Sequence, residues 1–134
     1  MSSDPSKTDI TRQLVRTMYE SSLAGDTERF MGCLDQNNLV VLEPSFLPYG
    51  GRIEGIAGFQ ALFAKVAQYI DLTSIKLDSV VADGDVGVAF IRAQSVNHDS
   101  EIQIAERSVV RDGKIVEMRV YFHELGSMTK VIKR

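Results

Sequence analysis

The chain has 134 residues, a length that favours one domain with a substantial core. Its formal net charge is −3 and it has no dense cluster of lysine and arginine, so nucleic-acid binding is not expected. No apolar run approaches the roughly 20 residues that a membrane span needs. The polar N-terminal segment lacks the apolar stretch of a signal peptide. A single cysteine, Cys33, excludes an internal disulfide, so these features favour a cytoplasmic protein.

Two helices are predicted before the first strand, after a disordered tail at residues 1–7. The first runs from about Asp9 to Ala24, capped by Ser6 or Thr8. Gly25 can adopt the positive φ that ends a helix, and Asp26 can cap a second helix that continues to about Leu34. The apolar stripe expected on the first helix comprises Ile10, Leu14, Val15, Met18 and Ser22.

A short buried strand, Leu39-Val40-Val41-Leu42, follows and leads directly into an acid, Glu43. Pro44 ends the strand because it has no amide hydrogen to donate. We expect a loop through Gly50 and Gly51, which allow a tight turn, and then a third helix from about Ile56. Its apolar positions recur at helical spacing: Ile56, Phe59, Leu62, Phe63, Val66 and Ile70.

Four consecutive strands are then predicted at 72–82, 86–97, 102–111 and 115–123. Asp83-Gly84 and Asp112-Gly113 are strong hairpin turns because glycine accepts positive φ. The order is two helices, a strand, a third helix and four strands. This order indicates an α+β domain at 8–126, in which three helices from the N-terminal half pack on the concave face of a curved, antiparallel-type sheet. Residues 127–134 are expected to be a C-terminal tail.

Several motifs in this order resemble the cone-shaped, cystatin-like fold of ketosteroid isomerase, the SnoaL-like polyketide cyclases and nuclear transport factor 2. They are Ala24-Gly25-Asp26, Val41-Leu42-Glu43-Pro44, Pro48-Tyr49-Gly50-Gly51 and the run from Gly113 to Phe122. The resemblance covers about residues 8–125. It implies a homodimer that pairs through the outer face of the sheet. It does not by itself imply one activity, because this fold carries enzymes and non-catalytic proteins.

The resemblance to ketosteroid isomerase also implies site residues. The isomerase base is an Asp before a Pro at the end of the first strand, and Glu43 takes that place here. The isomerase's second carboxyl, held protonated as a donor to the substrate oxygen, corresponds to Glu106. Its tyrosine donor on the first helix falls at Met18 by direct count, one position before Tyr19. We therefore expect Glu43 as base, with Glu106 and Tyr19 as donors.

Alternation along the last strand gives an independent indication of the pocket. Met118, Val120 and Phe122 share one face, and Arg119, Tyr121 and His123 share the other. The apolar set is expected to line the pocket, with His123 on the outside and His98 in a solvated turn. The full set of expected lining residues is Met18, Phe46, Tyr49, Phe59, Phe63, Arg92, Met118, Val120 and Phe122.

Both carboxyls also have structural interpretations. Glu106 lies on an apolar-leaning face, where a carboxylate must be paired or protonated, and Arg92 on the neighbouring strand is a candidate ion-pair partner. Glu43 could instead accept backbone N–H groups from the following loop. If the two acids share an apolar pocket, burial raises both pKa values. One ionised and one protonated carboxyl could then move a proton next to a carbonyl, which is the chemistry that the resemblance to ketosteroid isomerase implies.

The sequence therefore predicts a protein that binds a small apolar, carbonyl- or ring-containing molecule and that acts, if catalytic, as an acid–base isomerase. The alternatives are a non-catalytic binding protein and a dimeric assembly domain of the same fold. No residues have the spacing of a metal site, and no cofactor is expected.

Overall fold

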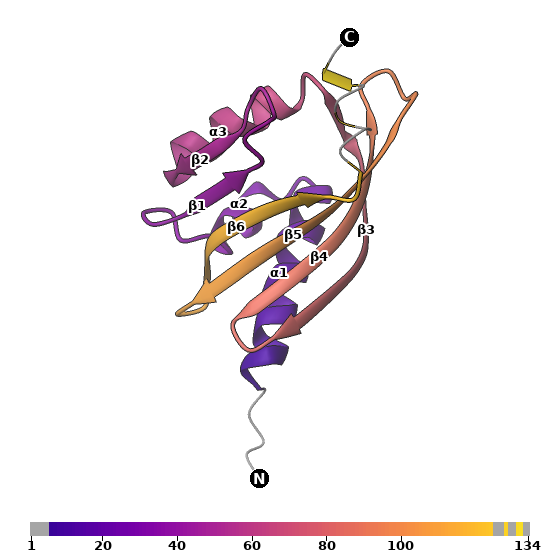
Figure 1. The fold of residues 1–134 in the computed structure, drawn as a ribbon. Helices are drawn as coiled ribbons and strands as arrows, with labels where there is room; N and C mark the ends of the chain where they lie inside the picture. The colour runs from indigo at the N-terminus through magenta and orange to yellow at the C-terminus, as the bar shows by residue number, and fades with distance from the viewer. Residues whose placement is uncertain (1–5, 125–127, 129–130, 133–134) are drawn as a thin grey trace.

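A computed structural model describes residues 6–124, 128, 131 and 132. The helices are α1 (Lys7–Leu23), α2 (Thr27–Gly32) and α3 (Gly55–Val66). The strands are β1 (Val40–Glu43), β2 (Gly51–Glu54), β3 (Ile70–Asp83), β4 (Val86–Ser95), β5 (Glu101–Arg111) and β6 (Lys114–Phe122). The predicted α+β class with three helices and a curved sheet is confirmed (Figure 1).

The sheet has six strands in the order β2-β1-β6-β5-β4-β3. The sequence does not predict β2, which pairs with β1 as an antiparallel hairpin. The loop expected after Pro44 therefore ends at Gly50, and β2 begins one residue later. β1 pairs with β6 in parallel, and the remaining pairs are antiparallel. Figure 1 shows the long strands β3 to β6 curving together. The β1–β2 hairpin forms the edge of the sheet opposite to β3 and lies beside α3.

The helix ends follow the predicted capping residues. Ser6 caps α1 by accepting from the backbone N–H of Asp9, and Asp26 caps α2 by accepting from that of Arg29. Gly25 has φ +74°, the conformation expected after a helix. α1 packs against β3 and β4, and α2 packs on α1. The two hairpin turns also form, with Gly84 and Gly113 at positive φ.

The buried face of α1 differs from the predicted stripe. Val15 and Met18 are buried as expected, but Ile10 is 48% exposed and Ser22 is exposed. Thr11 and Tyr19 are buried instead. The contact surface on α1 is therefore rotated, which turns the Tyr19 side chain toward the sheet.

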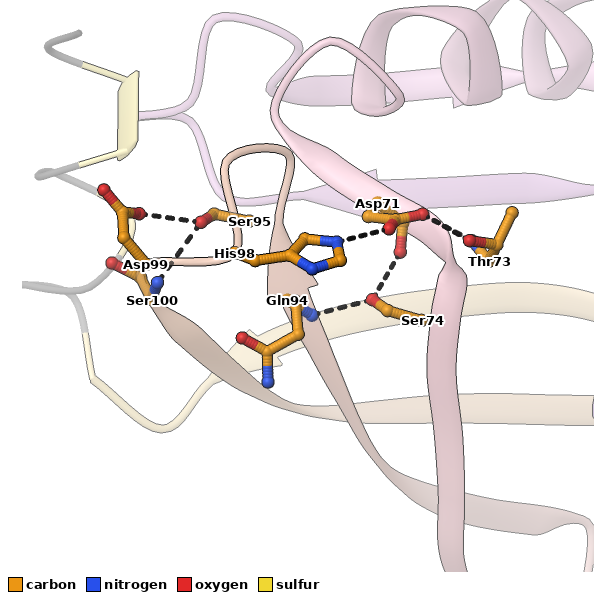
Figure 2. A network of polar contacts seen from close by, with 8 residues as sticks. All are labelled: Asp71, Thr73, Ser74, Gln94, Ser95, His98, Asp99 and Ser100. Atoms are coloured by element: carbon orange, nitrogen blue, oxygen red, sulfur yellow. Dashed lines mark hydrogen bonds and ion pairs between the residues drawn. The ribbon is translucent and has the colours of Figure 1, made fainter.

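A break in the β3–β4 register bends the sheet near its upper end. Between Asp71 and Lys76 the pairing shifts, and the amide of Gln94 donates to the hydroxyl of Ser74 at 2.8 Å. Ser74 in turn donates to the carbonyl of Asp71 at 2.6 Å. Figure 2 shows this arrangement beside the β4–β5 loop, where His98 reaches across to Asp71. Such irregularities increase local twist and bend the strand, which helps the sheet to curve around the helices.

The chain ends fall partly outside the described residues, including positions 1–5 of the predicted N-terminal tail. Lys7 already belongs to α1. Within the predicted tail at 127–134, Met128 and Val131 are fully or nearly fully buried in the core. That segment therefore contributes core contacts at these two positions. In the described part of the chain, no helix combines the length and apolar character that a membrane crossing requires.

Candidate active site

A cavity of about 630 Å³ lies between the helices and the concave face of the sheet. Its walls are mostly apolar, and all three helices contribute to them through side chains such as Met18, Phe30 and Phe59. The aromatic rings of Phe30, Phe59 and Phe63 pack together on the helical side, with centroid separations from 4.7 to 6.1 Å. Apolar walls with a few polar groups are typical of a small-molecule site.

The three predicted catalytic residues, Tyr19, Glu43 and Glu106, all line this one cavity. Most of the predicted lining residues do so as well: Met18, Tyr49, Phe59, Phe63, Met118, Val120 and Phe122. The alternation along β6 explains the last three, since Met118 and Val120 are buried while Arg119 and Tyr121 are exposed. His123 is exposed, as its position on the opposite face predicts.

Two predicted lining residues lie elsewhere. Phe46 is 42% exposed and does not line the cavity; the centroid of its ring lies 6.3 Å from that of Phe122. Arg92 lies on the outer face of the sheet, where its Nε binds Asp78 at 2.8 Å. The reason is alternation along β4, which turns Ile91 and Ala93 inward and Arg92 outward.

The predicted ion pair between Arg92 and Glu106 is therefore wrong. Glu106 pairs in the ladder with Ala89 of β4 and Val120 of β6, both of which are buried. Its partner is Tyr19, whose hydroxyl donates to Oε1 of Glu106. Burial raises the pKa of Glu106 from 4.5 to about 7. The rotation of α1 thus brings a tyrosine hydroxyl to the acid on β5.

Glu43 has no comparable partner. One of its carboxyl oxygens, Oε2, is buried and makes no hydrogen bond within the described chain. The alternative in which loop amides hold a Glu43 carboxylate is therefore wrong for this oxygen. Burial alone raises the pKa of Glu43 from 4.5 to about 8, because the apolar surroundings disfavour the charged form.

Strand register places the two acids across the cavity from each other. Leu42 is opposite Arg119, so Glu43, one residue further on, lies level with Val120. Glu106 is also opposite Val120, on the other side of β6. Two strand spacings of about 4.8 Å put their backbones roughly 10 Å apart. A small ring compound lying over Val120 would have a carboxyl on each side.

The loop between β1 and β2 carries Tyr49 into the cavity beside Glu43. Tyr49 is 4% exposed, and its ring lies 5.9 Å from that of Tyr69. The loop is compact because a side chain at Gly50 would meet the carbonyl oxygen of Pro44 at 2.1 Å. Burial raises the pKa of Tyr49 above its ordinary range, and the negative charge that Glu43 can carry adds to this shift.

Sequence reasoning missed several lining residues. Ile91 and Ala93 could have been found from the β4 alternation that also excludes Arg92. Gln60 and Thr73 are exposed polar residues on the cavity wall. Gln60 follows Phe59 on α3, but a polar residue next to an apolar stripe gives no clear signal in the sequence.

A second cluster of polar groups lies where β3 begins and β4 ends. Nε2 of His98 lies 2.6 Å from Oδ2 of Asp71, and Asp71 also accepts from Thr73 (Figure 2). His98 does lie in a turn and is largely exposed, with φ 58°. Among the described residues, no three His, Cys, Asp or Glu side chains come together in a way that could hold a metal ion.

The model of the SnoaL-like domain family matches residues 15–118. This chain belongs to that family. The SnoaL-like match spans the cavity from α1 to β6 and includes all three candidate catalytic residues. Among proteins with curated descriptions, none matches the chain.

Solved structures with the SnoaL-like chain's fold include an NTF2-like protein of unknown function from Burkholderia pseudomallei K96243. It has a TM-score of 0.78 and 21% identity, over 93% of this chain and 98% of that one. TerC, co-crystallised with polyporic acid, has a TM-score of 0.77 and 17% identity, over 93% and 99%. A proposed ketosteroid isomerase from Kribbella flavida DSM 17836 has a TM-score of 0.70 and 18% identity, over 89% and 82%. At these identities the likeness establishes the fold alone.

Proposed function

We propose that this protein is an acid–base isomerase that moves a proton next to the carbonyl group of a small apolar ring compound. The observation that carries the proposal is the pair of carboxyls, Glu43 and Glu106, facing one apolar cavity from opposite sides of Val120. With pKa values raised to about 8 and about 7, both lie near neutral pH, where a group transfers protons best.

The cavity supports a ligand of this class. Its volume of about 630 Å³ lies within the range of roughly 300–1,000 Å³ found for small-molecule sites. Aromatic walls from Phe59 and Phe63 suit the faces of a ring. TerC, which shares the fold, was co-crystallised with polyporic acid, so a protein of this shape has been studied with a small organic molecule.

The reaction needs no cofactor in this proposal. One carboxylate removes a proton from the carbon next to the carbonyl, and neutral donors stabilise the resulting enolate oxygen. The same carboxyl returns the proton to another carbon. A buried, apolar setting strengthens the hydrogen bonds to the enolate, because water does not compete for them.

The test is the conversion of β,γ-unsaturated cyclic ketones to conjugated enones, followed by the rise in ultraviolet absorbance. We expect turnover by the native protein and its loss, by about a hundredfold or more, in the double variant Glu43→Gln/Glu106→Gln. Glu101→Gln, at an exposed position on β5, is the matched control and should keep full activity.

A non-catalytic binding protein would give a different result. It would bind the ketones without converting them, and the double variant would bind them equally well. That outcome, across a panel of one- to four-ring ketones, would contradict the isomerase proposal.

We also propose that two copies pair through the outer face of the sheet. Phe90 and Tyr121 are 42% and 48% exposed there and border a groove that also includes Asp78 and Arg92. Apolar rings with charges of both signs on one face suit self-complementary pairing about a two-fold axis. Sedimentation velocity should show a dimer that Phe90→Asp/Tyr121→Asp dissociates, while Ile10→Asp, equally exposed on α1, should leave it intact.

A monomeric native protein at all concentrations tested would refute the dimer without affecting the proposed chemistry.

A further inference from the structure

The two acids in the cavity are held differently, and this difference bears on their roles. Glu106 accepts a hydrogen bond from the hydroxyl of Tyr19. Glu43 has a buried oxygen, Oε2, with no hydrogen-bond partner within the described residues. Among the described residues, only Glu106 therefore has a hydrogen-bond donor in place.

A donated hydrogen bond favours the charged form of a carboxyl, whereas burial without a partner favours the neutral form. No cation changes this balance, because none of the ion pairs in the described part of the chain includes Glu43 or Glu106. The nearest candidate from the sequence, Arg92, is bound to Asp78 outside the cavity. Glu106 is thus the acid better prepared to carry a negative charge.

The surroundings of Glu43 suit a donor instead. Tyr49 lies close enough to interact with Glu43 electrostatically, is buried and lines the same cavity. A protonated Glu43 and the neutral Tyr49 hydroxyl together provide two O–H donors on one side of the cavity. Two such donors aimed at one point can bind an enolate oxygen.

We infer that Glu106, supported by Tyr19, is the base of this site, and that protonated Glu43 with Tyr49 binds the enolate oxygen. This inference rests on the proposed function and reverses the roles that the resemblance to ketosteroid isomerase implies. Tyr49 becomes a catalytic residue, and Tyr19 becomes a positioning residue that acts through Glu106. Burial raises the pKa of both acids, so either of them can hold a proton near neutral pH, and their contacts distinguish their roles.

The step balances without another reactant. The C–H bond next to the carbonyl breaks and its proton goes to Glu106, while the electron pair forms the carbon–carbon double bond of the enolate. The carbonyl oxygen gains the negative charge and accepts hydrogen bonds from Glu43 and Tyr49. The proton on Glu106 then returns to the γ carbon, and the carbonyl double bond forms again.

The test uses 2-naphthol, whose anion resembles an aromatic enolate. The neutral and anionic forms differ in absorbance and emission, and the chain contains no tryptophan to obscure the emission. Dissociation constants of the naphtholate would be measured for the native protein, Glu106→Gln, Glu43→Gln and Tyr49→Phe. Glutamine has the shape of a protonated glutamate and can donate, but it cannot act as a base or carry a charge.

On this assignment, Glu106→Gln binds naphtholate about tenfold or more tightly, because it removes the negative charge of the base. Glu43→Gln and Tyr49→Phe each bind it more weakly, by about three- to tenfold, because each weakens or removes a donor. Ser45→Ala, at an exposed position of the same loop, is the control and should change nothing.

Tighter binding in Glu43→Gln and weaker binding in Glu106→Gln would overturn the assignment. It would also be overturned if all variants bound naphtholate equally well, or if no variant and not even the native protein bound it. The isomerase proposal can fail independently of this assignment. If the naphtholate binds in the expected pattern but no enone forms from any ketone, the isomerase is refuted while the roles of the donors and of the negative carboxyl stand.

Discussion

At the scale of single residues, the site depends on two half-buried acids that form no ion pair within the described part of the chain. Glu43 is the last residue of the apolar strand β1, and it lines the cavity. The sequence shows that this acid is unusually placed, because the strand–acid–proline order is visible. It cannot show the lack of a hydrogen bond to Oε2, which depends on the path of the following loop.

Glu43 should make the stability of the protein depend on pH. In the unfolded chain a glutamate loses its proton near pH 4.5, whereas folded Glu43 keeps its proton up to about pH 8. Between these values the unfolded state binds fewer protons, so the free energy of unfolding falls as the pH rises. Glu43→Gln removes this effect, because an amide has no proton to release.

We therefore expect Glu43→Gln to match the native protein near pH 4 and to exceed its unfolding free energy by roughly 2–4 kcal/mol near pH 9. Urea denaturation at a series of pH values gives this comparison, with Glu124→Gln as the control at an exposed position. A difference that stays constant over this pH range would contradict the burial of an uncompensated acid.

At the scale of elements, local signals were predictable and tertiary contacts were not. The caps at Ser6 and Asp26 and the turns at Gly84 and Gly113 follow from short-range chemistry. The face of α1 does not, because Met18 and Tyr19 are adjacent and only the packing against β3 and β4 decides how far the helix is rotated. β2 was missed because four residues beginning with a glycine carry little strand signal.

The bend in β3 also came from contacts that the sequence does not reveal. Ser74 replaces a backbone partner for the amide of Gln94 where the ladder shifts. Ser74→Ala should leave that amide without its acceptor and lower the free energy of unfolding by about 1–2 kcal/mol. Urea denaturation measures the change, and Ser79→Ala, exposed on the same strand, is the control and should have little effect.

If Ser74→Ala unfolds at the same urea concentration as the native protein, the side chain is not supporting the bend.

At the scale of the whole molecule, the order of helices and strands was enough to predict a curved sheet around a pocket. The contents of the pocket followed only where alternation was used consistently. It placed Met118 and Val120 correctly on β6, and the same rule on β4 would have excluded Arg92. The partner of Glu106 came from a helix far away in the sequence, which no strand pattern can predict.

We propose that one apolar cavity holds two glutamates that ionise near neutral pH. Carbon-13 NMR of protein labelled at the glutamate side-chain carboxyls tests it directly, with Glu43→Gln and Glu106→Gln assigning the two signals. We expect two resonances that titrate well above the others, Glu106 near pH 7 and Glu43 near pH 8. If both instead titrate near 4.5, the ordinary value for glutamate, the cavity leaves its acids ionised and the proposed chemistry loses its basis.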